Sequence, residues 1–415
     1  MCDTIARYSN YIEVYIVETI ELSVFDHGAQ HTEILRALLD VFEARQHIKV
    51  HLDVIPWLGS WSRMVQVALY KDGPDVSEIG STWIGDFSNM NAVRAFTAEE
   101  IHQMGGASAF LKPSWQGAGT QSGLHSSDFT LWGMPWLADV RVIVYRRDIY
   151  EQAGIDLNAA FKNQETLEHT FAQLQSAGVE VPLVLPTLRS RIDLHILASW
   201  IWAEGGKFFD PLQERILFDQ PEVLRGLARY FGLGRFLAPA ARGLDDLTAN
   251  DSFFNGHAAT VIGGHWLLLD ERIRKNFADK IGVIGVPPSS FVGGSHFVIW
   301  QHSRRASAAF KLIEFLAGSD TPLDLYPGFG FPTRLDAIAR ADFVKDPNWN
   351  AMIQAAAHGR TIPVGRLWGM IEKRLVDLIP VVWHEIFATE NPEVEAIVSR
   401  RFTAVAERLR LTLHA

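Results

Sequence analysis

Four tryptophans stand directly after expected strands or in loops marked by Gly and Pro: Trp57, Trp83, Trp136 and Trp266. The chain has 13 tryptophans, many for a side chain that is costly to bury without a partner for its indole N–H. An indole presents a flat apolar face with a polar edge, so such an excess indicates either heavy cores or a surface that stacks ligand rings. Packing in a core is the ordinary alternative for any one of the four.

Polar residues follow the same expected strands. Asp26 and His27 come after the first strand, where they can reach a ligand hydroxyl or form a turn that Asp26 caps. Asp139 and Arg141 share one face of a strand at i, i+2 spacing. We expect Asp139 to contact the ligand and Arg141 to have a structural role, although a simple salt bridge between them is the alternative.

No motif of covalent or metal catalysis accompanies these residues. The chain lacks Gly-x-Ser-x-Gly, His-Glu-x-x-His and a phosphate-binding Gly-x-x-x-x-Gly-Lys. His296 and His302 have no third ligand at a useful spacing, so we expect no metal and no cofactor. A glycosidase needs only two carboxylates about 5–10 Å apart, so Asp139 with Glu204 or Asp251 keeps that alternative open. The expectation is binding without catalysis and no catalytic residue.

The elements that must position these side chains begin as a regular alternation. The hydrophobic pattern predicts strands over 20–24, 48–54 and 75–79, separated by helices over 34–42 and 61–69. This order implies parallel strands joined by right-handed crossovers. Further on, the pattern predicts a capping box at Thr97–Glu100, strands over 140–145, 280–286 and 296–300, and helices over 164–177, 193–203, 222–230, 306–317 and 367–387.

Three breaks interrupt the pattern, near residues 140, 287 and 330. A chain that crosses three times between two α/β lobes would break in about these places, and its ligand cleft would lie at the carboxyl ends of the strands. We therefore expect a first lobe of residues 1–140 plus 287–329 and a second lobe of 141–286 plus 330–415.

Several weaker candidates lie near these breaks. Trp202 is closer to Gly205-Gly206 than Trp200 is and is the better ligand candidate, whereas Trp383 lies in an apolar helical stripe and is assigned to the core. Gly264, and Gly294 with Ser295, allow backbone N–H groups to approach a ligand closely, with ordinary turns as the alternative. Arg334 can reach the cleft from the third crossing.

The chain resembles the family 1 extracellular solute-binding proteins, the sugar-binding components of ABC importers, over roughly residues 19 to 413. No single motif is diagnostic, but their order and spacing are fairly specific. The motifs are Val24-Phe25-Asp26-His27-Gly28, Pro56-Trp57, Gly80-Ser81-Thr82-Trp83, Gly133-Met134-Pro135-Trp136, Asp139-x-Arg141, Tyr145-Arg146-Arg147-Asp148, Phe254-x-Gly256-x-Ala258-Ala259, Gly263-Gly264-His265-Trp266, Gly293-Gly294-Ser295, Gly330-Phe331-Pro332-Thr333-Arg334 and Trp368-x-x-Ile371-Glu372.

The resemblance implies a periplasmic-binding-protein-like fold, a three-segment hinge, a small carbohydrate ligand such as a di- or oligosaccharide, and a membrane permease as partner. It also favours ligand stacking by at least two of the four tryptophans. We expect a monomer. A ligand sensor of the same fold in the cytoplasm is the alternative function.

Composition narrows the partners and leaves the location open. The formal net charge of −10 and the lack of a basic stripe argue against nucleic-acid binding. Cys2 is the only cysteine, which excludes an intramolecular disulfide. The family is extracytoplasmic, but the first twenty residues show no secretory signal, so the cytoplasm is an alternative, as is a lipidated Cys2. No segment approaches the ~18 apolar residues that span a bilayer.

Overall fold

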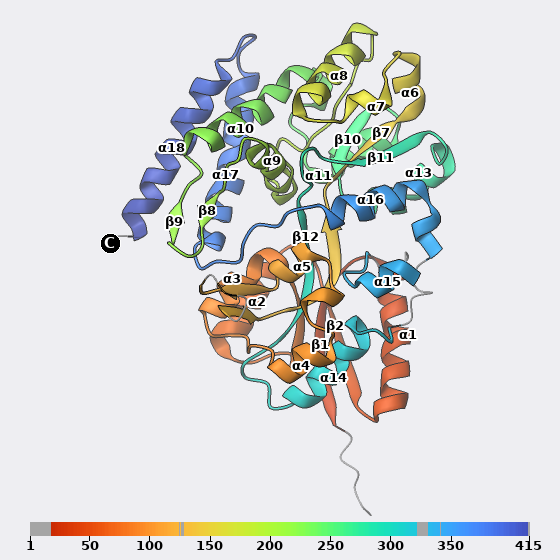
Figure 1. Cartoon of the computed structure of the whole chain (residues 1–415), viewed down its shortest axis with the longest axis vertical. Coiled ribbons are helices and arrows are strands. Elements are labelled where there is room, and N and C mark those ends of the chain that lie inside the picture. Colours follow the sequence, from red (N-terminus) through yellow and green to blue (C-terminus); the bar gives the residue numbers. More distant parts are fainter. Residues whose placement is uncertain (1–17, 124, 126–127, 322–330, 341, 414–415) are drawn as a thin grey trace, which may run out of the picture.

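The computed structural model describes residues 18–123, 125, 128–321, 331–340 and 342–413. Two α/β lobes are stacked along the long axis of the molecule (Figure 1). This arrangement confirms the predicted fold class. Among the described residues, no helix combines the length and apolar character that crossing a membrane requires.

The first lobe is built on a five-stranded sheet of order β2-β1-β3-β12-β6. β1 pairs in parallel with both β2 and β3, and β12 runs antiparallel to β3 and β6. The elements of this lobe are β1 (Thr19–Phe25), α1 (Ala29–Gln46), β2 (Lys49–Ile55), α2 (Ser60–Tyr70), β3 (Val76–Gly80), the 3-10 turn η1 (Ser81–Trp83), α3 (Ile84–Asn89), α4 (Ala98–Gln103), α5 (Lys112–Gln116), β4 (Gly119–Gln121), β5 (Phe129–Leu131), β6 (Met134–Val140), β12 (Val292–Ile299) and α14 (Ala306–Ala317).

The expected alternation at the start of this lobe is confirmed, because each predicted strand and helix coincides with an observed element to within one residue at the start of each strand. The capping box is also present. The Thr97 hydroxyl accepts from the Glu100 N–H at 3.2 Å, and the Glu100 carboxylate accepts from the Thr97 N–H at 2.8 Å.

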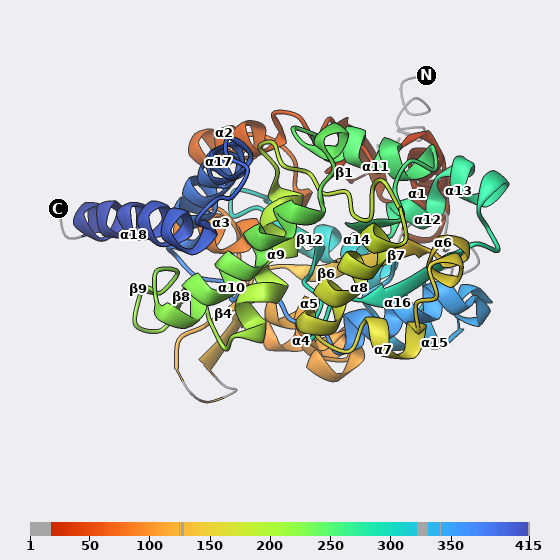
Figure 2. The same cartoon turned by 90° about the horizontal axis from the view of Figure 1, so that it is seen from above.

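The second lobe has a smaller sheet of order β10-β7-β11, antiparallel throughout, within a larger helical mass. From above, α17 and α18 form one flank of this lobe and α6, α13 and α16 the other (Figure 2). Its elements are β7 (Val142–Arg146), α6 (Arg147–Gln152), α7 (Leu157–Ala160), α8 (Gln164–Ser176), α9 (Arg191–Ala203), β8 (Phe209–Asp210), β9 (Arg215–Ile216), α10 (Pro221–Gly232), α11 (Asp246–Phe254), β10 (Thr260–Gly263), α12 (Trp266–Leu269), α13 (Glu271–Asn276), β11 (Ile281–Gly285), α16 (Pro347–Ala357), α17 (Trp368–Phe387) and α18 (Val394–Leu413).

The apolar run 140–145, predicted as one strand, differs in the structure. It is divided between the end of β6 in the first sheet and β7 in the second, with Arg141 between them. The hydrophobic pattern is continuous because both strands are buried on both faces. Periodicity alone therefore cannot show where the chain leaves one sheet and enters the other.

Three chain segments meet between the lobes. The Arg141 N–H donates to the Phe291 carbonyl at 2.9 Å, the Val292 N–H to the Arg360 carbonyl at 2.8 Å, and the Arg360 N–H to the Ser290 carbonyl at 2.9 Å. These hydrogen bonds join three connections, β6–β7, β11–β12 and α16–α17, at one place.

The structure departs from the expected division after residue 330. Residues 322–330 lie outside the described residues, but Pro332 bridges to Leu137 and Arg334 to Phe110, both in the first lobe. The short helix α15 (Leu335–Arg340) lies beside that lobe (Figure 1). The following helix, α16, packs on β11 of the second lobe. The Gly/Pro signal marked a loop, and long-range pairing decided on which lobe the loop ends.

Candidate functional site

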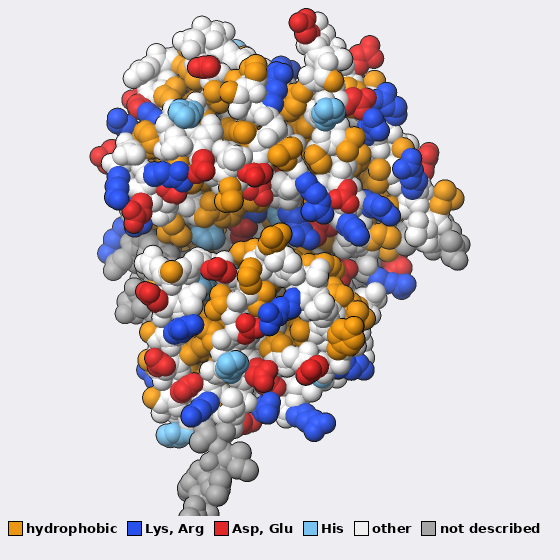
Figure 3. All heavy atoms as spheres, turned by 180° about the vertical axis from the view of Figure 1, so that it is seen from behind, with side chains coloured by type: hydrophobic (Ala, Val, Ile, Leu, Met, Phe, Trp, Pro, Cys, Tyr) orange, Lys and Arg blue, Asp and Glu red, His pale blue; other side chains and the backbone are white. Residues whose placement is uncertain are grey.

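The boundary between the lobes collects most of the predicted site residues. From behind, the molecular surface is indented between the two lobes, and histidine and acidic side chains are visible there (Figure 3). The first lobe contributes the carboxyl ends of β1 and β3, and the second contributes the loop between β10 and α12.

A buried carboxylate organises the first-lobe side. Glu78 of β3 is fully buried, and its two oxygens accept from the Phe25 N–H at 2.8 Å and pair with His27 Nε2 at 2.7 Å. The Ser295 hydroxyl is a third partner. Glu78 is not among the predicted site residues; its only signal in the sequence is an acidic residue inside an apolar strand. Ser295 holds Glu78 here, and Glu78 in turn fixes the imidazole of His27.

His27 and Glu78 each stabilise the charged form of the other. Burial lowers the pKa of His27, but the neighbouring Glu78 carboxylate and its hydrogen bond raise it, leaving the pKa above its usual value. Burial raises the pKa of Glu78, and His27, Ser295 and the Phe25 N–H lower it to a net value below the usual one. The ion pair is thus favoured at the lobe boundary.

This pair predicts a pH-dependent contribution to stability. The contribution of His27 is complete below its unfolded pKa of about 6.5 and is lost as the pH rises through the raised folded pKa. We expect His27→Gln to lower the free energy of unfolding more at about pH 5.5 than at about pH 8.5, as measured by urea unfolding. The exposed His51→Gln is the control. An equal loss for His27→Gln at both pH values would contradict the assignment.

Trp57 forms an exposed aromatic face at the end of β2. Its side chain is 49% exposed, and its ring centroid lies 4.4 Å from that of Phe25 and 5.4 Å from that of His27. The indole is therefore supported from beneath and open on its outer side. This is the geometry that a stacking ring needs.

Trp83 lies deeper in the same aromatic cluster. It is only 4% exposed and packs edge-on to Phe25 and Trp61, with ring centroids 5.6 and 5.2 Å away. The guanidinium of Arg191, from α9 of the second lobe, lies 5.6 Å from its ring centre. Trp83 thus supports the first-lobe aromatic cluster and contacts the opposite lobe.

Trp136 is a core residue in the structure. It is 2% exposed, stacks on Phe297 at a centroid distance of 4.3 Å, and meets the His31 ring at 5.7 Å. The prediction that it contacts a ligand is therefore corrected. A tryptophan after a Gly-x-Pro turn has the same local sequence in both situations, and only the packing of α1 and β12 distinguishes them.

On the opposite side, Arg141 links the hinge to the second lobe. It is buried, donates to Asp139 Oδ1 and lies 3.2 Å from His195 Nδ1. Its guanidinium also lies 5.0 Å from the ring centre of Trp266. Asp139 stays partly exposed, so the two residues form a pair in which Arg141 braces and Asp139 faces the boundary.

The loop after β10 presents His265 and Trp266, both partly exposed. A Cβ on Gly264 would lie 2.1 Å from the Trp266 ring. Only glycine lets the indole lie this close to the backbone, so Gly264 positions Trp266 rather than binding a ligand itself. His265 was not selected from the sequence.

His265 carries an unpaired buried atom. Its Nδ1 has no hydrogen-bond partner among the described residues. Burial lowers the pKa of His265 to about 4; Asp139 opposes the shift, while His27 and Arg141 reinforce it. Because His27 belongs to the first lobe, charges from both lobes act on His265. A buried polar atom without a partner is unfavourable unless water or a ligand satisfies it.

Other predicted site residues have structural contacts. Trp202 is buried, with its ring 6.4 Å from that of Phe291 and the Arg360 guanidinium 4.8 Å away, so it belongs to the hinge. Asp26 accepts from the Gly28 N–H at 2.8 Å and forms the turn given as its alternative. Gly294 has a φ of +132°, and a Cβ there would lie 2.0 Å from the Leu137 carbonyl oxygen, so strand pairing requires it.

Arg334 does not point to the boundary between the lobes. Its guanidinium donates to the Met104 carbonyl at 2.7 Å, forms two hydrogen bonds with Asp336, and lies over Phe110. These contacts fix the segment after residue 330 to the first lobe. The expected approach of Arg334 to the ligand is corrected, because hydrogen bonds with the Met104 carbonyl and the Asp336 carboxylate hold its guanidinium elsewhere.

Two carboxylates of the hydrolase alternative are held in ion pairs. Of the proposed hydrolase carboxylates, Glu204 pairs with Arg225 and Arg229 at 3.3 Å and Asp251 with Arg272 at 2.9 Å. Within the described ranges, no three His, Cys, Asp or Glu side chains come together to hold a metal ion. Aromatic and hydrogen-bonding groups from both lobes lie near the boundary.

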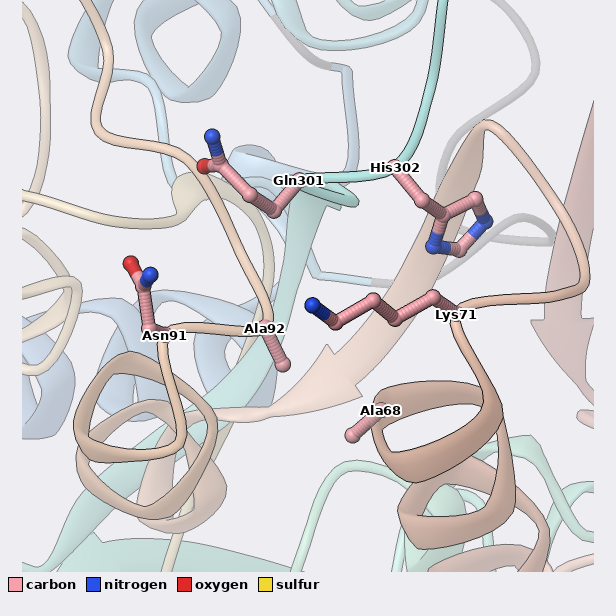
Figure 4. A pocket seen from close by; sticks show the side chains of 6 residues that line it. All are labelled: Ala68, Lys71, Asn91, Ala92, Gln301 and His302. Carbon is pink, nitrogen blue, oxygen red and sulfur yellow. The ribbon is translucent and has the colours of Figure 1, made fainter.

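A second hollow lies on the first lobe, lined by Ala68, Lys71, Asn91, Ala92, Gln301 and His302 (Figure 4). It follows the carboxyl end of β12. Because β12 runs antiparallel to β3, this hollow lies at the opposite edge of the sheet from His27 and Trp57. It is separate from the site between the lobes.

Comparison with known proteins agrees with this architecture. Residues 28–321 match the model of a family described as bacterial extracellular solute-binding protein. The diacetylchitobiose binding protein DasA of Streptomyces coelicolor is 21% identical over 379 residues, 86% of this chain and 83% of that protein. A probable amino-acid ABC transporter periplasmic-binding protein of Sinorhizobium fredii, y4oP, is 25% identical over 228 residues, 53% of this chain and 52% of that protein.

Solved structures show the same fold. The sugar-binding protein MalE of Xanthomonas citri has a TM-score of 0.78 with 18% identity, covering 95% of this chain and 99% of that one. A solute-binding protein of Thermotoga lettingae bound with alpha-D-tagatose has a TM-score of 0.76 with 19% identity, covering 94% and 99%.

Proposed function

Because the chain belongs to the bacterial extracellular solute-binding proteins, we propose that it captures a small carbohydrate between its lobes and delivers it to the permease of an ABC importer. The observation that carries the ligand class is an exposed indole on each lobe, Trp57 on the first and the partly exposed Trp266 on the second. Sugar rings have apolar C–H faces that stack on indoles, and hydroxyl rims that need hydrogen bonds.

Five residues form the proposed ligand set: His27, Trp57, Asp139, His265 and Trp266. The two indoles supply stacking faces. His27, Asp139 and His265 supply donors and acceptors at the lobe boundary, and the unpartnered Nδ1 of His265 supports a ligand contact there. Glu78, Arg141 and Gly264 hold this set in place from behind. A di- or oligosaccharide would reach groups on both lobes at once.

The relatives support this ligand class through their names. One is named for diacetylchitobiose, and one structure contains alpha-D-tagatose. Members of the family are extracellular by description, so we place this protein outside the cytoplasmic membrane, acting as a single chain that releases its sugar unmodified.

We expect a bound carbohydrate to raise the melting temperature. A ligand that binds only the native state stabilises it by about 4 kcal/mol at a thousand times Kd. The measurement is a thermal-shift panel of mono-, di- and oligosaccharides, with amino acids and glycerol phosphates included because other relatives are named for these ligands. No shift with any sugar at millimolar concentration would reject the carbohydrate assignment, and sugar recovered cleaved in proportion to time would reject binding without catalysis.

A further inference from the structure

The two lobes also touch away from the proposed ligand set, where α3 of the first lobe meets the start of α17 of the second. The contact is close, with a glycine on each side. A Cβ on Gly369 would lie 2.2 Å from an Asp86 carboxylate oxygen, and a Cβ on Gly85 would lie 2.7 Å from the Gly365 carbonyl oxygen. The Asp86 carboxylate therefore lies directly against the first turn of α17.

A second carboxylate faces this contact from α17. Glu372 is 4% exposed, and Thr82 of the first lobe, Trp368 and Arg191 lie near its carboxylate. The distance from Arg191 Nε to Glu372 Oε2 is 3.4 Å. Among the described residues, neither Asp86 Oδ2 nor Glu372 Oε1 has a hydrogen-bond partner.

Few charges compensate the two acids. Arg191 of α9 is the cation that acts on Glu372, and half of its side chain is exposed. The neighbouring η1 and β4 contribute no ionisable side chain, and Arg366, just before α17, lies 3.8 Å from Glu214 instead. Two acids from opposite lobes thus meet beside one partly solvated cation, which acts on Glu372.

Protonation of Asp86 would remove the repulsion between the two carboxylates. Burial and the charge of Glu372 raise the pKa of Asp86 to about 7. Burial also raises the pKa of Glu372, against the opposing effect of Arg191 and the hydrogen bonds. When the lobes separate, Asp86 returns to water, where an aspartate is ionised above about pH 4.

We propose that closing the two lobes takes up one proton from solvent, which Asp86 of α3 holds against Glu372 of α17, and that opening releases it. This inference rests on the proposed function only in assuming that the lobes open and close. Ligand capture would then be coupled to proton uptake, and ligand release would be favoured as the pH rises.

The test uses the ligand-free chain with one fluorophore on each lobe, and measures the interlobe distance between pH 5.5 and 8.5. A carboxyl with a pKa of about 7 in the closed form and about 4 in the open form changes the closed-to-open ratio about tenfold between about pH 6 and pH 8. We expect Asp86→Asn to remove this change, keeping the closed form at high pH. Asp377→Asn, an exposed position on the same helix, should retain the wild-type dependence.

Several outcomes decide the proposal. Histidines also titrate at this boundary, so the informative quantity is the part of the pH dependence that Asp86→Asn removes. If the wild type shows no dependence, or Asp86→Asn keeps it in full, proton uptake at this contact is excluded. Should Asp86→Asn fail to fold, Glu372→Gln must move the transition to lower pH, and an unmoved transition would equally exclude it.

The same samples distinguish this proposal from the proposed function. A protein that gains thermal stability with a carbohydrate but closes equally at all pH values would support the proposed function and reject proton uptake. A protein that closes as the pH falls but gains no stability from any sugar would support proton uptake and reject the carbohydrate ligand.

Discussion

Trp383→Ala is expected to lower the free energy of unfolding by about 3–5 kcal/mol, the usual range for a large aromatic core side chain. The indole is 1% exposed and packs against Phe231 and Tyr230 at centroid distances of 4.8 and 5.7 Å. Its Nε1–H donates to Asp193 Oδ2 at 2.9 Å. The substitution would leave both a cavity and a buried carboxyl oxygen without its donor.

Urea or thermal unfolding measures this loss. Val381→Ala, at a position on the same helix that is 43% exposed, should change stability by less than about 0.5 kcal/mol. The Trp383 variant should still bind sugar with unchanged intrinsic affinity at a temperature where it is folded. A stable Trp383→Ala protein that no longer binds would overturn the assignment of this residue to the core.

Trp57→Ala should have the opposite effects: weaker binding in a protein of nearly wild-type stability. An aromatic anchor at a binding surface contributes about 2 kcal/mol or more, which is a roughly thirtyfold rise in Kd. The exposed indole covers Phe25 on one face only, so its removal opens no internal cavity. Titration calorimetry with the sugar found by thermal shift measures the change.

Two comparisons sharpen this second result. The neighbouring Leu58 is 95% exposed, and Leu58→Ala should leave Kd unchanged. Trp266→Ala, on the opposite lobe, should also weaken binding strongly if the ligand is held from both sides. Wild-type affinity in both Trp57→Ala and Trp266→Ala would show that neither indole stacks the ligand, and the proposed set would have to be abandoned.

Local sequence pattern determined most of the helices and strands of this protein. The alternation of β1, α1, β2, α2 and β3 follows from side-chain periods of 2 and 3.6 residues, which each segment carries by itself. The capping box at Thr97 needs only residues three positions apart. The order of motifs along the chain was enough to identify the fold family.

Tertiary structure decided the roles of individual residues within that fold. Trp57 and Trp136 occupy similar loop contexts, yet one is open and the other is covered by Phe297 and His31. Burial depends on segments far away in the sequence, and local context does not encode it. Local sequence likewise could not reveal the role of Glu78, because that role depends on partners on β1 and β12.

The crossings between the lobes were also decided by tertiary structure. The run 140–145 is uniformly apolar, so only pairing partners could divide it between two sheets. Arg334 was assigned to the ligand by its place after a Gly/Pro loop, whereas Met104 and Asp336 hold it elsewhere. Periodicity reports which face of an element is apolar, but which side chains meet is set by strand register and lobe packing, and these depend on the whole chain at once.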